Sequence, residues 1–212
     1  MRDNSMVTEN FIALIGKVES ITKIHERLGA SYYEIELVVN RTTEGKCDHI
    51  VVYAPHWALP KEFALDKTVR VIGEVRTYKN RISSWQAKRT MVYTKKIIMA
   101  SDNSPHINQV EIIGELHQVW NPRETPLSGK MITDFSVLVL RNDGYGKGER
   151  ADLVHCLAWG EQAAVFNEII ENGGRIRILG RLQERKFEKQ HPNGKVTKET
   201  IHEISCRAIE KY

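Results

Sequence analysis

The sequence predicts an all-β protein that consists of two copies of one small barrel. Three stretches of the first half recur in the second half in the same order. Residues 10–16 match 108–114, residues 33–41 match 133–141, and residues 69–75 match 176–182. The offset between matching stretches rises slowly along the chain, as expected for a tandem duplication whose second copy has longer loops. Two domains of about a hundred residues each lie within the usual size range of a domain.

The first three strands of the second copy are the easiest to place. Residues 110–119 are rich in β-branched side chains and alternate roughly between apolar and polar, which predicts a strand. Residues 121–129 contain two prolines and a glycine and therefore form a loop. Alternation predicts a second strand around Phe135, Val137 and Val139, and a third at residues 152–159.

A helix and two further strands complete this copy. Ala163, Phe166 and Ile170 have helical spacing and precede a Gly-Gly pair, which predicts a helix of about three turns. Residues 175–182 alternate between aliphatic side chains and arginine, and a long polar hairpin leads to a last strand at residues 200–209. Three strands, a helix and two strands at this size predict the five-stranded Greek-key barrel called the OB-fold.

The first copy follows the same order with shorter parts. Its helix is predicted at residues 59–65, where Pro60 limits it to little more than one turn. Both copies have glycine inside the first and fourth strands, which predicts bulges or sharp bends that let the sheet close. The predicted organisation is an N-terminal arm at 1–9, a first OB-fold at 10–100, a linker at 101–107 and a second OB-fold at 108–212.

The composition excludes several classes of protein. No apolar stretch has the length of a signal peptide or a membrane span, so we expect a cytoplasmic, nucleoid-associated protein without a membrane partner. Cys47, Cys156 and Cys206 are widely spaced and form no C-x-x-C motif, so we interpret them as buried or incidental thiols. Neither His155-Cys156 nor the pair His202 and Cys206 has a second ligand pair at zinc-site spacing, and we expect no metal and no cofactor. No catalytic motif is recognisable, so the sequence predicts a protein that is not an enzyme.

The distribution of charge points to nucleic acid. The net charge of +4 belongs wholly to residues 1–104, whereas residues 105–212 are neutral overall. Residues 75–101 contain seven cations and no acid, with three aromatic residues between them. Such a mixture can follow a phosphate backbone and stack unpaired bases, although a solvated basic surface is the alternative.

The second copy contains a series of short motifs over residues 108–210. They are Asn108, Val110, Gly114 and Leu116; Arg123, Thr125 and Gly129; Phe135 and Val137; Cys156, Trp159 and Gly160; Gly173, Ile176, Ile178, Gly180 and Leu182; and Arg185, Lys186 and Phe187. In these motifs the second copy resembles the bacterial single-stranded-DNA-binding protein family. The first copy resembles the small primosomal OB-folds of the same superfamily more weakly.

The resemblance implies particular positions for base stacking. Phe187 stands where the family commonly has a stacking tryptophan, Trp159 ends the third strand, and Tyr145 lies in a loop that often meets DNA. Leu153 departs from the family, because many members have tryptophan there. Together with the basic stretch of the first copy, these considerations predict a DNA-binding set of Arg76, Tyr78, Lys79, Arg81, Trp85, Lys88, Arg89, Arg123, Tyr145, Lys147, Trp159, Arg177, Arg185, Lys186, Phe187 and Lys189.

Some assignments keep an alternative. For Trp159 the alternative is a core or interface residue, and Tyr53 and Trp57, which lie near prolines, are expected in the core or against the helix. The resemblance implies sequence-independent binding of single-stranded DNA in replication, recombination or repair, with RNA left open. It also implies a homodimer that supplies four OB-folds. The sequence ends at Tyr212, soon after the last predicted strand, so we expect no acidic tail for recruiting replication enzymes. The alternative is a primosome-type accessory protein that acts mainly through protein–protein contacts.

Overall fold

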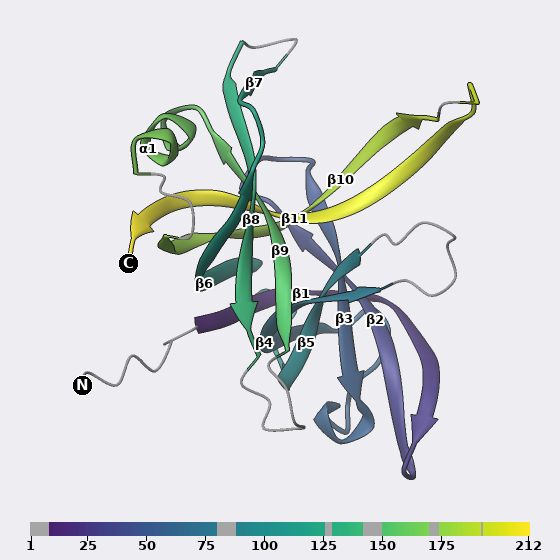
Figure 1. Cartoon of the computed structure of the whole chain (residues 1–212). Coiled ribbons are helices and arrows are strands. Elements are labelled where there is room, and N and C mark those ends of the chain that lie inside the picture. Colours follow the sequence, from purple (N-terminus) through teal and green to yellow (C-terminus); the bar gives the residue numbers. More distant parts are fainter. Residues whose placement is uncertain (1–8, 80–87, 126–128, 142–149, 170–173, 192) are drawn as a thin grey trace. The chain divides into compact units, whose positions relative to one another are not determined.

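The computed structural model describes residues 9–79, 88–125, 129–141, 150–169, 174–191 and 193–212, which form mostly β-strands (Figure 1). Among the helices of this part of the chain, none has the length and apolar character that crossing a membrane requires. The chain forms two compact units. One contains residues 12–109 and 182–203, and the other contains 1–11, 110–181 and 204–212. The outer part of the last hairpin therefore groups with the first copy.

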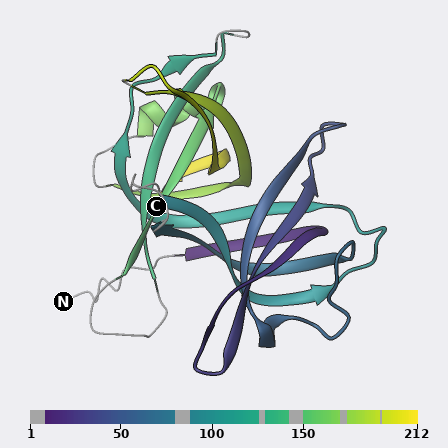
Figure 2. The same ribbon diagram turned by 90° about the vertical axis from the view of Figure 1, so that its right-hand side faces the viewer.

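Five strands make up the first copy: β1 (Glu9–Arg27), β2 (Ala30–Asn40), β3 (Cys47–Pro55), β4 (Thr68–Lys79) and β5 (Lys88–Met99). They pair in the order β1-β2-β3-β5-β4, and β4 pairs again with β1, so the sheet closes (Figure 1 and Figure 2). The β3–β5 pair is parallel and the others are antiparallel. Alternate side chains of β2 point inward, so that Ile35, Leu37 and Val39 are at most 1% exposed.

The second copy repeats this pairing. Its strands are β6 (Ile107–Val119), β7 (Arg123–Glu124), β8 (Met131–Leu140), β9 (Ala151–Trp159), β10 (Arg175–Gln190) and β11 (Val196–Lys211). The closed order is β6-β8-β9-β11-β10, with a parallel β9–β11 pair, and short β7 adds to β8. Both copies therefore have the pairing order of the predicted Greek-key barrel.

The helices of the two copies differ. The second copy has α1 (Glu161–Ile169), whose Phe166 is fully buried and stacks on Phe135 with ring centroids 4.2 Å apart. Within its described residues, the first copy has a 3₁₀ turn, η1 (His56–Ala58), in place of a helix. The helix predicted at residues 59–65 is wrong, because these residues are not helical. Proline disfavours helical backbone in the residue before it, and Leu59 is accordingly extended with φ −83° and ψ 125°.

Glycine occurs where the first strand of each barrel crosses the second at close range. A Cβ atom on Gly16 would lie 2.7 Å from the carbonyl oxygen of Val38, and one on Gly114 would lie 2.6 Å from that of Leu138. Shortly after each glycine the register shifts by one residue, in β1 before Ser20 and in β6 before Gln118. The predicted bulges are confirmed here, and they bend each first strand so that it can pair on both sides.

Each copy contains the same kind of buried ion pair. Arg41 Nε donates to Asp48 Oδ2 over 2.9 Å, and Arg141 Nε donates to Asp152 Oδ2 over 2.7 Å. Asp48 is 1% exposed and Asp152 is fully buried. In each copy the arginine follows the second strand and the aspartate opens the third, so the pair joins the two strand ends beside their loop.

Candidate nucleic-acid interface

The outer face of the first barrel carries five aromatic rings that contact one another, here named the aromatic cluster. Tyr53 lies at its centre, with ring centroids 5.5 Å from Tyr32, 5.6 Å from Tyr93, 6.2 Å from Tyr78 and 6.0 Å from His25. His25 stacks on Tyr32 at 4.7 Å. The four tyrosines are half-buried and His25 is exposed, so solvent reaches the rim of the cluster.

Strand register assembles this cluster from all five strands of the barrel. Val52 and Ala54 of β3 point into the core and are fully buried, which turns Tyr53 outward. The parallel pairing of β3 with β5 sets Tyr53 directly beside Tyr93. Tyr53 was predicted from the sequence to lie in the core or against the helix. This prediction was wrong, because the alternation of side chains along β3 turns Tyr53 outward.

Trp57 extends the aromatic surface from η1. Its ring is 62% exposed and meets Tyr32 edge-on, with centroids 5.8 Å apart. The prediction that Trp57 lies in the core or packs against the helix was also wrong. Its exposed ring lies beside the aromatic cluster and gives a base a further stacking face.

Burial raises the pKa of the central phenol, Tyr53, further above the neutral range. Desolvation, together with the neighbouring phenols of Tyr78, Tyr32 and Tyr93, raises the pKa of Tyr53 to about 12. The Tyr53 hydroxyl lies 3.3 Å from Nε2 of His25. A neutral ring does not repel a phosphate, so this surface suits stacking beside a charged backbone.

Arg76 supports the cluster from β4. Its guanidinium lies 4.0 Å from the centroid of Tyr93 and donates to Glu74 over 2.8 and 3.1 Å. Lys95 contacts the other oxygen of Glu74 at 2.6 Å. Burial acts to raise the pKa of Glu74, but the hydrogen bonds from Lys95 and Arg76 outweigh burial and lower it. Arg76 was predicted to contact DNA; it is only 7% exposed and stacks against a ring of the cluster.

The second barrel presents a smaller aromatic site. Trp120, just after β6, is 39% exposed and its ring centroid lies 5.3 Å from that of His155. Asp134 lies between His155 at 3.3 Å and Arg123 at 2.9 Å. Burial acts to raise the pKa of Asp134, while the bonds from His155 and Arg123 lower it, so the carboxylate is charged.

Arg123 was predicted from the sequence as a DNA-binding residue, whereas Trp120 and His155 were not. The available signal was an aromatic residue directly before the Asn-Pro loop. Trp159, at the end of β9, is half-buried, which is compatible with partial access to a base.

The β10–β11 hairpin carries Phe187, which is half-buried beneath a cation. The guanidinium of Arg185 lies 5.3 Å from the Phe187 centroid and binds fully buried Glu203 through two hydrogen bonds of 2.9 and 3.0 Å. Lys186 is 71% exposed and contacts Glu184 at 3.0 Å.

Of the remaining predicted residues, some have described side-chain contacts and the others have no described side chain. Arg89 pairs with Glu34 at 3.0 Å, and Arg177 donates to Glu111 over 2.8 Å and to Glu210 over 3.2 Å. Tyr78 belongs to the aromatic cluster. The others are not described at the level of side chains: Arg81, Trp85, Tyr145 and Lys147 lie outside the described residues, and Lys79, Lys88 and Lys189 are placed by their strand backbone only.

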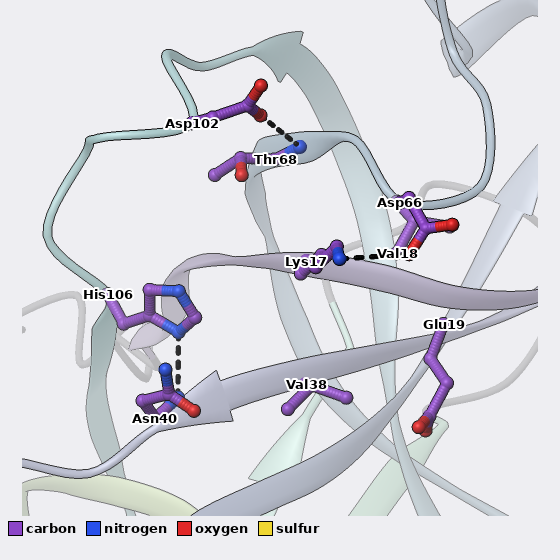
Figure 3. A pocket seen from close by; sticks show the side chains of 9 residues that line it. All are labelled: Lys17, Val18, Glu19, Val38, Asn40, Asp66, Thr68, Asp102 and His106. Atoms are coloured by element: carbon purple, nitrogen blue, oxygen red, sulfur yellow. Dashed lines mark hydrogen bonds and ion pairs between the residues drawn. The ribbon is translucent and has the colours of Figure 1, made fainter.

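A polar pocket of about 570 Å³ opens elsewhere on the first barrel (Figure 3). Lys17 binds Asp66 at 2.9 Å on one side, and His106 Nδ1 accepts a 2.7 Å hydrogen bond from the backbone N–H of Asn40 on the other. Glu19 and Asp102 add two more carboxylates to the lining. Three carboxylates against one lysine disfavour an anion, so this pocket is a poor phosphate site.

A model of the family described as the single-strand binding protein family matches residues 107–212, which is half of the chain. The chain belongs to the single-strand binding protein family. The recognition made from the motifs of the second copy is therefore confirmed.

Individual relatives are similar over part of the chain. Single-stranded DNA-binding protein 1 of Streptococcus agalactiae is 35% identical over 85 residues, which cover 40% of this chain and 52% of that protein. Single-stranded DNA-binding protein 1 of Staphylococcus aureus is 30% identical over 105 residues, which cover 49% and 60%. The chain thus spans about half the length of the curated relatives it matches.

The fold extends the similarity to the whole chain. The crystal structure of wild-type single-stranded DNA binding protein from Thermus aquaticus matches 97% of this chain and 93% of its own, with a TM-score of 0.71 and 15% identity. At that identity the match concerns the fold alone, and it confirms the predicted all-β OB-fold class.

Proposed function

We propose that this protein binds single-stranded DNA independently of base sequence, as a component of replication, recombination or repair. The observation that carries the proposal is the aromatic cluster, a partly exposed set of four tyrosine rings and one histidine ring on an OB-fold barrel. Membership in the single-strand binding protein family supports it and favours it over an accessory protein that acts mainly through protein contacts. The role is binding and not catalysis.

The proposed mechanism combines stacking with phosphate neutralisation. Unpaired bases stack on Tyr53 and its neighbours, on Trp57, and in the second copy on Trp120, Trp159 and Phe187, each stacked base contributing about 1–3 kcal/mol. The partly or largely exposed cations Lys186 and Arg89 attract the phosphates of the strand. A duplex offers no unpaired base to these rings, so single strands are preferred.

Two barrels in one chain imply a long binding site. One OB-fold covers about 4–16 nucleotides, so a strand that visits both barrels should exceed the length that one barrel needs. Linking two moderate sites raises the apparent affinity through effective concentration. We further propose a homodimer with four OB-folds, which sedimentation of the free protein at micromolar concentration would test.

The deciding experiment is a competition measured by fluorescence anisotropy. A labelled dT oligomer is bound at one fixed salt concentration and displaced by unlabelled single-stranded DNA, RNA of the same sequence, or duplex. Displacement by single-stranded DNA at far lower concentration than by duplex supports the proposal, and the RNA arm decides between the two sugars. Absence of binding at low salt, or equal competition by duplex, contradicts it.

A further inference from the structure

A second group of functional side chains lies on the outer face of the first barrel. It contains Glu19, Glu36 and His49, here named the β1–β3 ligand cluster. The Nδ1 atom of His49 lies 2.8 Å from a carboxylate oxygen of Glu19 and 3.5 Å from one of Glu36. One donor atom from each of the three residues lies within 4.8 Å of the other two. The cluster takes no part in the proposed stacking surface.

The backbone brings these residues together in a way that the spacing of the sequence does not reveal. They come from three neighbouring strands, with Glu36 on central β2. Glu19 is the extra residue of the β1 bulge, because Val18 pairs with Leu37 and Ser20 pairs with Glu36. A bulge re-aims the side chain that it carries, and here the carboxylate of Glu19 reaches His49 across the intervening strand.

The geometry suits a small divalent cation. Zinc binds imidazole nitrogen and carboxylate oxygen at about 2.0–2.2 Å, so two ligand atoms of a tetrahedral site lie roughly 3.3–3.5 Å apart. The 3.5 Å distance from His49 to Glu36 lies in that range, and the 2.8 Å distance to Glu19, a hydrogen-bond length, reaches it if the Glu19 side chain moves back by about half an ångström. The side chains are 30% exposed for His49, 47% for Glu19 and 40% for Glu36. Solvent can therefore supply the fourth ligand, as in three-residue zinc sites.

The second ring nitrogen of His49 has a partner of its own. Its Nε2 lies 3.7 Å from the sulfur of Cys47, on the side of the ring away from the carboxylates. Metal-binding histidines commonly use their other nitrogen in a hydrogen bond that fixes the ring orientation. Cys47 can supply that contact, and its position on the far side of the ring prevents it from joining the same ion.

We propose that Glu19, Glu36 and His49 bind one divalent transition-metal ion of the Zn²⁺ type. Imidazole with two carboxylates is a ligand set that suits this class of ion. The ion also offsets the two negative charges that Glu19 and Glu36 otherwise hold together beside His49. The ammonium of Lys186 contacts Glu184 at 3.0 Å, which raises the pKa of Lys186, and Glu36 contributes further to that rise.

The test is calorimetric titration of the full chain with ZnCl₂ after treatment with a chelator. We expect one Zn²⁺ to bind per chain. Its Kd should rise by about 10–100-fold or more in Glu19→Gln, Glu36→Gln and His49→Asn. The matched control is Glu26→Gln, since Glu26 is an exposed glutamate of the same strand that is bonded only to Lys23 in the structure. This control should leave the Kd for Zn²⁺ unchanged.

Two further measurements keep the result unambiguous. Circular dichroism and the thermal midpoint establish that each variant is folded, which the partial exposure of the three side chains favours. Titration with Co²⁺ reports the ligand type, and a spectrum without a thiolate-to-metal band is expected. The proposal is overturned if the folded wild-type chain binds no Zn²⁺, if the three variants bind it as the wild type does, or if Cys47→Ser alone abolishes binding.

Discussion

Removing the central ring of the aromatic cluster should weaken the binding of single-stranded DNA without changing its dependence on salt. In Tyr53→Ala the ring that contacts Tyr32, Tyr78, Tyr93 and His25 is lost. If one stacked base leaves the surface with it, the loss is about 1–3 kcal/mol, or about 5- to 150-fold in Kd. Tyr53→Phe keeps the ring and loses only the contact of the hydroxyl with His25, so it should bind within about threefold of the wild type.

The salt dependence separates stacking from charge. Each phosphate neutralised on a single strand contributes a slope of about −0.7 to log Kobs against log salt. Because Tyr53 is neutral, Tyr53→Ala should shift this line downward and leave its slope unchanged. Anisotropy with a labelled dT oligomer at four salt concentrations measures both quantities. A folded Tyr53→Ala protein that binds within twofold of the wild type would refute the assignment of this cluster to DNA.

Three predictions concern stability. Asp152→Asn leaves mostly buried Arg141 without its ionic partner and should cost about 3–5 kcal/mol in urea unfolding, whereas Asp66→Asn, at an exposed pair, should cost under about 1 kcal/mol. Gly114→Ala forces a Cβ against the opposite backbone carbonyl and should cost about 1–3 kcal/mol by the same assay. The raised pKa of Tyr53 contributes stability that is complete below about pH 10 and lost as the pH rises toward 12. The free energy of unfolding should therefore fall across that window, and less steeply in Tyr53→Phe.

The barrels could be predicted because their signals are local or repeated. Strand alternation depends on neighbouring residues, and the internal duplication supplied a second reading of each strand. Glycine within a strand marks a close crossing whichever strand it meets, so Gly16 and Gly114 were interpretable without knowing their partners. The helix of the first copy was predicted at residues 59–65, but the turn η1 forms directly after β3 and ends before Pro60.

The aromatic cluster could not be predicted because it depends on register. Tyr32 and Tyr33 are adjacent in sequence, and only the pairing of β2 decides which one lies beside Tyr53. Trp57 was expected to be buried because it lies between prolines, yet η1 leaves its ring exposed. The β1–β3 ligand cluster escaped for the same reason, since no local spacing relates Glu19 to His49.

Strand register also changes the interpretation of residues 75–101, the basic stretch of the first copy. The stretch itself contains no acidic residue, but its cations bind carboxylates that lie on neighbouring strands or directly before the stretch in the sequence. Arg89 binds Glu34, and Arg76 and Lys95 share Glu74. In the described part of the chain these pairs engage three of the seven cations of the stretch, and Arg76 also supports Tyr93. The described part of the first barrel is therefore better suited to stacking bases than to neutralising phosphates, which is why a neutral residue, Tyr53, is the side chain whose loss should matter most there.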